Sequence, residues 1–453
     1  MEKTLKSAAL GFAFLSFVAA AYAENSSEKL SSALKNPFEI AELKRLASTD
    51  RDTALSLLTE ALNQDKDTAY RCAAIEALAS SKDEAVALAL TAAINDPNPG
   101  VQLCAARVAG EAKNSAAVDA LVANIESYSY RSDTRGPYEN NLQARLKAIN
   151  SIWSLGEIGN SKVMDKLAKF YSDSDDVIRI NLIISMGKLQ NSSKAGPYIK
   201  AIAASATETA VVRAAAFEML EETGQESALP GLTPSRSDGI EKGDIIYTGG
   251  IVGSIGAWLT PDLPIGHAGI FAGTATGNGR IYVVIADCVP DNFKPVGGVR
   301  NINSFKNFTH QFKFPYYGNR TSKTRPTAAQ REKIVALALK LGTTKGLHYS
   351  QSHASQKGHV DFDCVGYTEY LYEQAGLNPT DNSRETGLGW PLTPWEQFEA
   401  TVPNTTHTSR SMDASQTMIT PSNNAVEMLK NGLFGETGEL AEPDTQITPA
   451  IAQ

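Results

Sequence analysis

The chain has 453 residues, with 42 Lys and Arg against 50 Asp and Glu, and a formal net charge of −8 at pH 7. This length is too great for one ordinary hydrophobic core, so we expect two or three domains. An acidic chain without a long basic run argues against nucleic acid as the main partner, and 4 cysteines are too few for a disulfide scaffold.

Residues 1–23 have the order of a secretory signal peptide. Two lysines precede an apolar core at 8–21, and small residues at 21 and 23 place the expected cleavage after Ala23. A membrane anchor would need about 20 apolar residues, and this core is shorter. We therefore predict an exported mature protein, periplasmic or secreted, with no transmembrane segment after cleavage.

Residues 24–226 are predicted to form an all-α repeat domain, because apolar residues recur at helical spacing in five similar segments. Cys72 and Cys104 are 32 residues apart, and Gly156 and Gly187 are 31 residues apart. A unit of two short helices cannot bury its own apolar face, so we expect the copies to stack into a solenoid. This region resembles HEAT repeats of the short bacterial type. The five segments begin at Tyr70, Gln102, Arg145, Val177 and Val211.

Two further features of the repeats leave alternatives open. An insertion at 125–141 carries three tyrosines and two arginines, which indicates either a contact surface for a protein partner or a tolerated insertion. Cys72 and Cys104 occupy the same repeat position. We expect them to be small core residues rather than a disulfide, because stacked repeats hold such positions too far apart.

Residues 227–242, rich in Pro, Gly and Ser, are predicted to be a linker. After it the pattern becomes that of a mixed domain, so we expect an α+β fold over 243–402. A polar tail at 403–453 is predicted to be disordered. The expected elements are strands at 243–250, 267–273 and 280–289, and a helix at 327–342 that begins with Thr327 as its cap.

Cys364 is the candidate nucleophile. An apolar stripe at helical spacing follows it, and Gly376 with Pro379 marks the end of that helix, so the cysteine lies at a helix N-terminus. The unpaired N–H groups and the helix dipole there favour a thiolate and can face an oxyanion. Asp363 caps the helix well, but its charge opposes thiolate formation. The alternative is that Cys364 is a small buried core residue.

A thiolate nucleophile needs an imidazole as its base. His267 stands at the head of a strand with alternating apolar residues, which would fix the orientation of its ring. Asp287 ends the next strand, where a carboxylate could orient that imidazole. Strand alternation puts Cys288 on the opposite face from Asp287, so we expect Cys288 to be packed away from the site.

The other histidines carry weaker signals. His310 lies in a loop and His407 in the polar tail. His348, His353 and His359 crowd the loop before the candidate nucleophile, which suggests either a metal cluster or the lining of a cleft. This loop lacks the regular ligand spacing of zinc sites, so we predict no metal. We predict no cofactor either, because no glycine-rich phosphate loop or dinucleotide motif is present.

The nucleophile region, with Tyr349, then Phe-Asp-Cys, a glycine two residues on and Ala-Gly near the helix end, resembles that of the NlpC-type papain-like cysteine hydrolases. The histidine strand precedes the cysteine here, an order similar to the circularly permuted branch, which includes bacterial lipoprotein-like members and lecithin-retinol-acyltransferase-like enzymes. The resemblance implies a papain-like fold with Cys364 as nucleophile, His267 as base and Asp287 as the third polar residue. It also implies Tyr349 as an oxyanion-side contributor. Val365 departs from the pattern, because many members carry Ser there.

These observations favour an exported cysteine hydrolase whose thiolate attacks a carbonyl to give an acyl-enzyme that water resolves. The resemblance implies amide bonds in cell-wall peptides as substrate, and equally admits lipid or acyl substrates for an acyltransferase or thioesterase. A different alternative is a binding protein whose repeats capture a partner and whose hydrolase-like domain is not catalytic. In each case the repeats are expected to bind a partner or a substrate.

Overall fold

The computed structural model describes residues 56, 68–78, 83–128, 142–171, 175–189, 193–225, 240–250, 264–293, 297–350, 361–380 and 392–403. The predicted signal peptide, most of the predicted linker, most of the insertion and the tail beyond Pro403 lie outside these residues. Within the described residues, no helix is both long enough and apolar enough to cross a bilayer.

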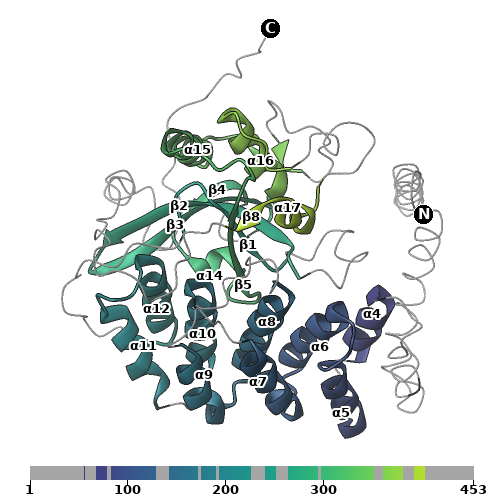
Figure 1. Ribbon diagram of the computed structural model, residues 1–453. Coiled ribbons are helices and arrows are strands. Elements are labelled where there is room, and N and C mark those ends of the chain that lie inside the picture. The colour runs from purple at the N-terminus through teal and green to yellow at the C-terminus, as the bar shows by residue number, and fades with distance from the viewer. Residues whose placement is uncertain are drawn as a thin grey trace, which may run out of the picture.

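The first half of the described chain is an array of helices in two rows, and the inner row faces the rest of the molecule (Figure 1). All five repeated segments of the sequence lie in inner helices, which confirms them as helical. The inner helices are α4 (Thr68–Leu78), α6 (Pro99–Glu111), α8 (Leu142–Ile158), α10 (Asp176–Lys188) and α12 (Ala210–Glu222). The outer row consists of α5 (Glu84–Ala93), α7 (Val118–Ser127), α9 (Met164–Tyr171) and α11 (Ala195–Ala204), with 3-10 turns η1 (Ser115–Ala117) and η3 (Ser161–Val163).

Buried ion pairs join successive repeats. In three places an arginine on one inner helix reaches an acidic residue just before the next inner helix, so each pair fixes the stacking of two neighbours. Removing one partner of such a pair leaves an uncompensated buried charge. The pairs are Arg71 with Asp96, Arg145 with Asp175, and Arg179 with Glu208.

Glycine recurs where inner helices approach most closely. A Cβ atom at Gly110 would lie 2.7 Å from the Ser154 Cα, and one at Gly156 would lie 2.8 Å from the Ser185 Cα. No larger residue fits at these crossings without moving a helix backbone, which explains the glycine spacing in the sequence.

The repeat cysteines behave as predicted. Cys72 and Cys104 are both buried, and neither forms a disulfide. The Cys104 thiol donates to the Cys72 carbonyl oxygen at 3.6 Å, so the two residues pack between adjacent inner helices as small apolar side chains.

The second half of the chain contains an antiparallel sheet with the strand order β4-β3-β2-β1-β5-β8. The strands expected at 243–250, 267–273 and 280–289 are confirmed as β1, β2 and β3 and form its centre. The sheet consists of β1 (Ile245–Thr248), β2 (His267–Gly277), β3 (Arg280–Val289), β4 (Gly298–Ile302), β5 (Tyr316–Thr321) and β8 (Val402–Pro403), and a parallel pair is formed by β6 (His348–Tyr349) and β7 (Asp361–Phe362).

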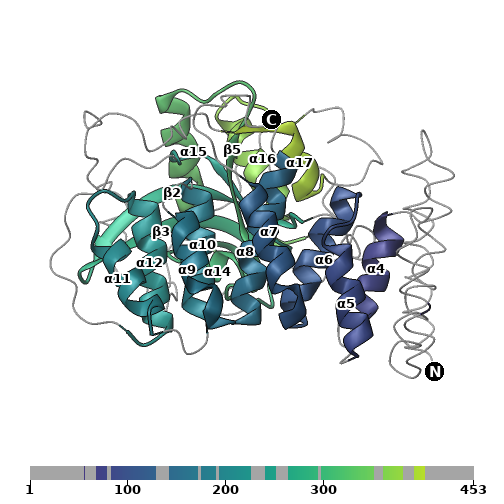
Figure 2. The same ribbon diagram turned by 60° about the horizontal axis from the view of Figure 1, so that its bottom comes forward.

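Helices cover both faces of the sheet (Figures 1 and 2). On one face lie α15 (Ala328–Leu341) and α16 (Cys364–Gln374), with α17 (Pro394–Ala400) beside α16. Thr327 forms a capping box with Gln330 at the start of α15, as predicted. The other face carries the short helix α14 (Phe305–Phe308) and the inner repeat helices α8, α10 and α12.

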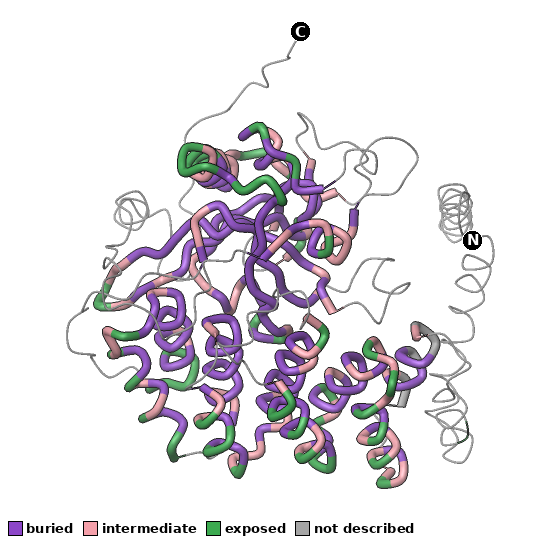
Figure 3. The backbone as a smooth tube through the Cα atoms, in the orientation of Figure 1, coloured by how far each residue is buried: buried purple, intermediate pink, exposed green. Residues whose placement is uncertain are grey.

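The inner repeat helices and the sheet share one buried layer (Figure 3). The Asn181 side chain pairs with the backbone of Tyr316 in both directions, donating to its carbonyl at 2.7 Å and accepting from its N–H at 3.0 Å. Asn150 accepts from the Tyr317 hydroxyl at 3.0 Å. The inner face of the repeats is therefore covered, over α8 to α12, by the chain's own sheet.

Candidate functional site

His267, the first residue of β2, is buried, and its Nε2 lies 2.9 Å from Oδ2 of Asp287 on β3. The strand register explains this contact. Asp287 is paired with Gly269, and side chains two residues apart on a strand share a face, so His267 and Asp287 project from the same side of the sheet. Sequence reasoning selected both residues, and the structure brings them together.

Arg300 completes this buried group and was missed from the sequence. It is paired with Asp287 in the β3–β4 register, and its Nε and Nη2 donate to the two carboxylate oxygens at 2.7 and 3.0 Å. Burial alone would raise the pKa of Asp287, but the Arg300 guanidinium and the hydrogen bond to His267 outweigh it and hold that pKa below its usual value. The carboxylate facing His267 is therefore charged at neutral pH. A basic residue in the short apolar strand "GVRNI" was the one signal that could have found Arg300.

Cys364 is the first residue of α16, as predicted, and it is 6 % exposed. Asp363 is the N-cap, and its carboxylate accepts from the Gly366 N–H at 2.5 Å. Ala268, the residue after His267, directs its backbone N–H to the cysteine sulfur. The candidate nucleophile thus lies against the backbone of the residue that follows the candidate base, whose ring packs against Phe308 and His310. Among the hydrogen bonds of the described residues, none joins the thiol to the imidazole directly.

The surroundings of Cys364 favour the neutral thiol. Burial, and next the charge of Asp363, raise the pKa of Cys364 well above its usual value, while the N–H groups of Ala268 and Val365 act in the opposite direction. Burial also raises the pKa of Asp363, to about 6, against the N–H groups of Gly366 and Val365. The opposed effects of Asp363 expected from the sequence, capping and repulsion, are both present. The helix N-terminus alone does not produce a resting thiolate.

Tyr349 and Cys288 lie at the entry to α16. Tyr349 on β6 is paired with Phe362, two residues before the candidate nucleophile, and its N–H donates to Asp291 at 2.8 Å. Cys288 is fully buried, and its Sγ lies 3.3 Å from the Phe362 carbonyl oxygen. It therefore lies on the opposite face from Asp287, as expected, but this is the face that carries α16 and Cys364, so the expectation that Cys288 is packed away from the candidate nucleophile is wrong. Burial raises the pKa of Cys288 well above its usual value.

His310 adjoins the site, although the sequence placed it only in a loop. Its ring centroid lies 5.3 Å from that of His267, and both rings are buried. His348 is exposed and pairs with Asp291 at 3.1 Å. His353, His359 and His407 lie outside the described residues. In the part of the chain that the structure describes, no group of three His, Cys, Asp or Glu side chains is arranged to hold a metal.

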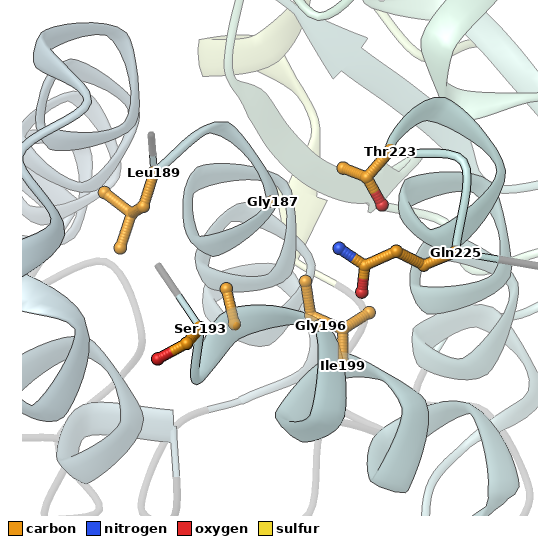
Figure 4. Close-up of a pocket in the computed structure, with 8 residues that line it drawn as sticks. Gly187, Leu189, Ser193, Gly196, Ile199, Thr223 and Gln225 are labelled. Carbon is orange, nitrogen blue, oxygen red and sulfur yellow. The ribbon is translucent and has the colours of Figure 1, made fainter. Parts of the chain in front are cut away.

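A separate pocket of about 450 Å³ lies on the repeats, between the end of α10, the start of α11 and the end of α12 (Figure 4). The side chains of Thr223 and Gln225 project into it, with Gln225 reaching across to Gly196. None of its described lining residues is charged, so the pocket offers no group that would anchor an ionic ligand.

Comparison with known families identifies HEAT repeats at residues 33–135 and 143–221. No curated protein matches the chain. The chain therefore consists of a HEAT-repeat region followed by a region with an antiparallel sheet and helices. HEAT repeats are consistent with a binding or scaffold role, and the repeat part of the sequence prediction is confirmed.

Proposed function

We propose that this protein is an exported cysteine hydrolase of the permuted, papain-like NlpC type, acting on amide bonds of cell-wall peptides. The carrying observation is the buried chain Arg300–Asp287–His267, together with the Cys364 sulfur at the head of α16, which faces the N–H of Ala268, the residue after His267. Structural ion pairs also occur in cores, but an imidazole held by a charged carboxylate at the same strand end as a cysteine on a helix N-terminus supplies a nucleophile, a base and an orienting acid.

The base in this proposal is the Nδ1 atom of His267, because Nε2 faces Asp287. Since the resting thiol is neutral, His267 takes the Cys364 proton as the sulfur attacks the substrate carbonyl, and the carbonyl oxygen becomes an oxyanion. The N–H groups of Ala268 and Val365, which already favour negative charge on the sulfur, lie where they can stabilise developing charge at this helix end.

Collapse of the oxyanion breaks the C–N bond, and His267 returns its proton to the leaving amine. Water then attacks the thioester, with the same imidazole taking a proton from it, and the thiol and a carboxylic acid are released. Asp287 stays ionised throughout because Arg300 holds its charge, and it stabilises the imidazolium between the two half-reactions. Tyr349 is proposed as an oxyanion-side contributor on the strand pair that leads into α16.

The test measures alkylation and turnover together. With iodoacetamide under native conditions, Cys364 is expected to react faster than Cys288, and His267→Gln is expected to slow Cys364 alkylation at least tenfold without changing Cys288. Turnover of peptidoglycan fragments should be abolished by Cys364→Ala and retained in Cys288→Ala. Equal labelling of the two thiols, together with a fully active Cys364→Ala protein, would exclude an enzymatic role at this site.

Assays with acyl esters distinguish the acyltransferase or thioesterase alternative. Cleavage of acyl esters but not of muropeptides would assign the same residues to that chemistry. We assign the HEAT repeats a binding or scaffold role. Their inner helices α8, α10 and α12 pack against the sheet, and we propose that the repeats also bind a protein partner. From the signal-peptide pattern at 1–23 we also propose export to the periplasm or the exterior.

A further inference from the structure

The turn at 310–312 has a strained backbone. His310, Gln311 and Phe312 have φ angles of 54°, 66° and 58°. None of them is glycine, and side chains of this size seldom adopt the left-handed region even singly. Three such residues in succession persist only where surrounding contacts hold them, and strain of this kind gathers at functional sites.

The contacts that hold this turn come from the HEAT repeats. The Phe312 carbonyl oxygen accepts a hydrogen bond from Trp153 Nε1 on α8 at 3.2 Å and another from Lys188 Nζ at the end of α10 at 2.6 Å. The Lys188 ammonium lies 5.7 Å from the centre of the Trp153 ring. Two adjacent inner helices therefore donate hydrogen bonds to the same carbonyl oxygen, which lies more than 120 residues from either donor in the sequence.

The turn held in this way places the His310 ring beside that of His267. The His310 ring is 5.3 Å from that of His267 and meets the aromatic rings of Phe293 and Phe314 at 4.8 and 5.8 Å. His310 is 5 % exposed, and within the described residues neither of its ring nitrogens has a hydrogen-bond partner. An imidazole held in an apolar setting without partners is kept in its neutral form.

We propose that the HEAT repeats influence the site through the 310–312 turn. Trp153 and Lys188 hold this turn, and the turn keeps an uncharged His310 ring packed against the ring of His267. His310 is a positioning residue, since it acts through the imidazole of His267. This inference rests on the proposed function for its catalytic consequence, but the state of His310 can be measured without any turnover.

The charged and titratable groups facing His310 come from three strands and its own loop: His267 on β2, Asp287 on β3, Arg300 on β4 and Lys313. Burial, and next the charges of His267, Arg300 and Lys313, lower the pKa of His310 to about 2 although Asp287 acts to raise it. If the turn were loosened so that water reached the His310 ring while it stayed beside His267, the pKa of His310 would return toward about 6.5. The ring would then be charged in mildly acidic solution.

A charged His310 would oppose the imidazolium that forms on His267 during catalysis. For two unit charges about 5 Å apart at an effective dielectric constant of about 20, the repulsion corresponds to roughly 100-fold in rate. The loss is confined to the pH range where His310 is protonated. A merely structural defect would instead lower activity at every pH.

The experiment uses the full chain with ¹³C-labelled histidine and compares wild type with Trp153→Phe, Lys188→Met and the double variant. In wild type the His310 resonance should not titrate between pH 5 and 8. In the double variant it should titrate near pH 6, and hydrolysis at pH 5.5 should fall about 100-fold while activity at pH 8 stays within about threefold of wild type. The single variants should lie between these limits.

Two controls sharpen the result. Glu157→Gln removes the ion-pair partner of Lys188 but leaves the hydrogen bond from Lys188 to the Phe312 carbonyl. The His310 resonance should therefore still not titrate between pH 5 and 8. Adding His310→Phe to the double variant removes the titrating group and should restore activity at pH 5.5. Three results would each overturn the proposal. The first is that His310 does not titrate in the double variant, the second is that His310→Phe does not restore hydrolysis at pH 5.5, and the third is that hydrolysis falls equally at all pH values. If no variant hydrolyses anything, the hydrolase proposal fails, while the titration still decides whether the repeats hold His310 neutral.

Discussion

Replacing Glu218 with glutamine is expected to remove a large part of the pH dependence of folding stability. Glu218 on α12 binds the N-terminus of α14. Its carboxylate accepts from the N–H groups of Phe305 and Lys306 at 2.8 and 3.0 Å and from the Ser304 hydroxyl at 3.2 Å. Burial raises its pKa from 4.5 to about 7, although these hydrogen bonds act to lower it. The folded state therefore binds a proton at Glu218 more tightly than the unfolded state does.

The sign and size of the effect follow from this shift. A pKa raised on folding gives stability that is fully present below pH 4.5 and is lost as the pH rises through 7. At about 1.4 kcal/mol per pKa unit, the loss between pH 5 and pH 8 amounts to about 2 to 3 kcal/mol. Glutamine cannot ionise, so the variant lacks this loss. Its own cost, a weaker acceptor for the α14 N–H groups, is independent of pH.

The measurement is urea unfolding of wild type and Glu218→Gln at pH 5 and pH 8, followed by fluorescence and circular dichroism to test for a single transition. The difference in unfolding free energy between the two proteins should change by about 2 to 3 kcal/mol between the two pH values, in favour of the variant at pH 8. Other titrating groups are common to both proteins and cancel. Glu222→Gln, on the same helix but in a half-exposed pair with Lys306, should show a change below about 0.5 kcal/mol. A constant difference for Glu218→Gln would refute the reasoning.

Two substitutions test other parts of the structure. Asp287→Asn leaves the Arg300 guanidinium buried without its counter-charge. It should lower the free energy of unfolding, measured by denaturation, by about 3 to 5 kcal/mol, and it should abolish peptide hydrolysis. A variant as stable as wild type would contradict the buried ion pair. Gly318→Ala should cost about 1 to 3 kcal/mol, because Gly318 has φ +98° and a Cβ there would lie 2.9 Å from the Val177 side chain. Gly224→Ala, at φ +65° with open space around it, should cost less, and equal costs would show that contact with the repeats is unimportant.

Local patterns in the sequence determined much of this protein. Helical periodicity and recurring glycines located the inner repeat helices, and the family comparison supports them. Alternation located β1, β2 and β3, and the caps at Thr327 and Asp363 located the starts of α15 and α16. Such signals are readable because a helix start or a strand face is set by residues a few positions apart.

Tertiary structure decided what lies between those elements. Arg300 reaches Asp287 only because β4 pairs with β3, and His310 reaches His267 only because a turn is held by helices from the other half of the chain. These partners are joined across strand registers and repeat stacking, which no local pattern specifies. The sequence by itself therefore determined the candidate nucleophile, base and orienting acid. Strand pairing and burial decided which charges surround them, because contacts across the sheet, not neighbours in the chain, set most of those electrostatics.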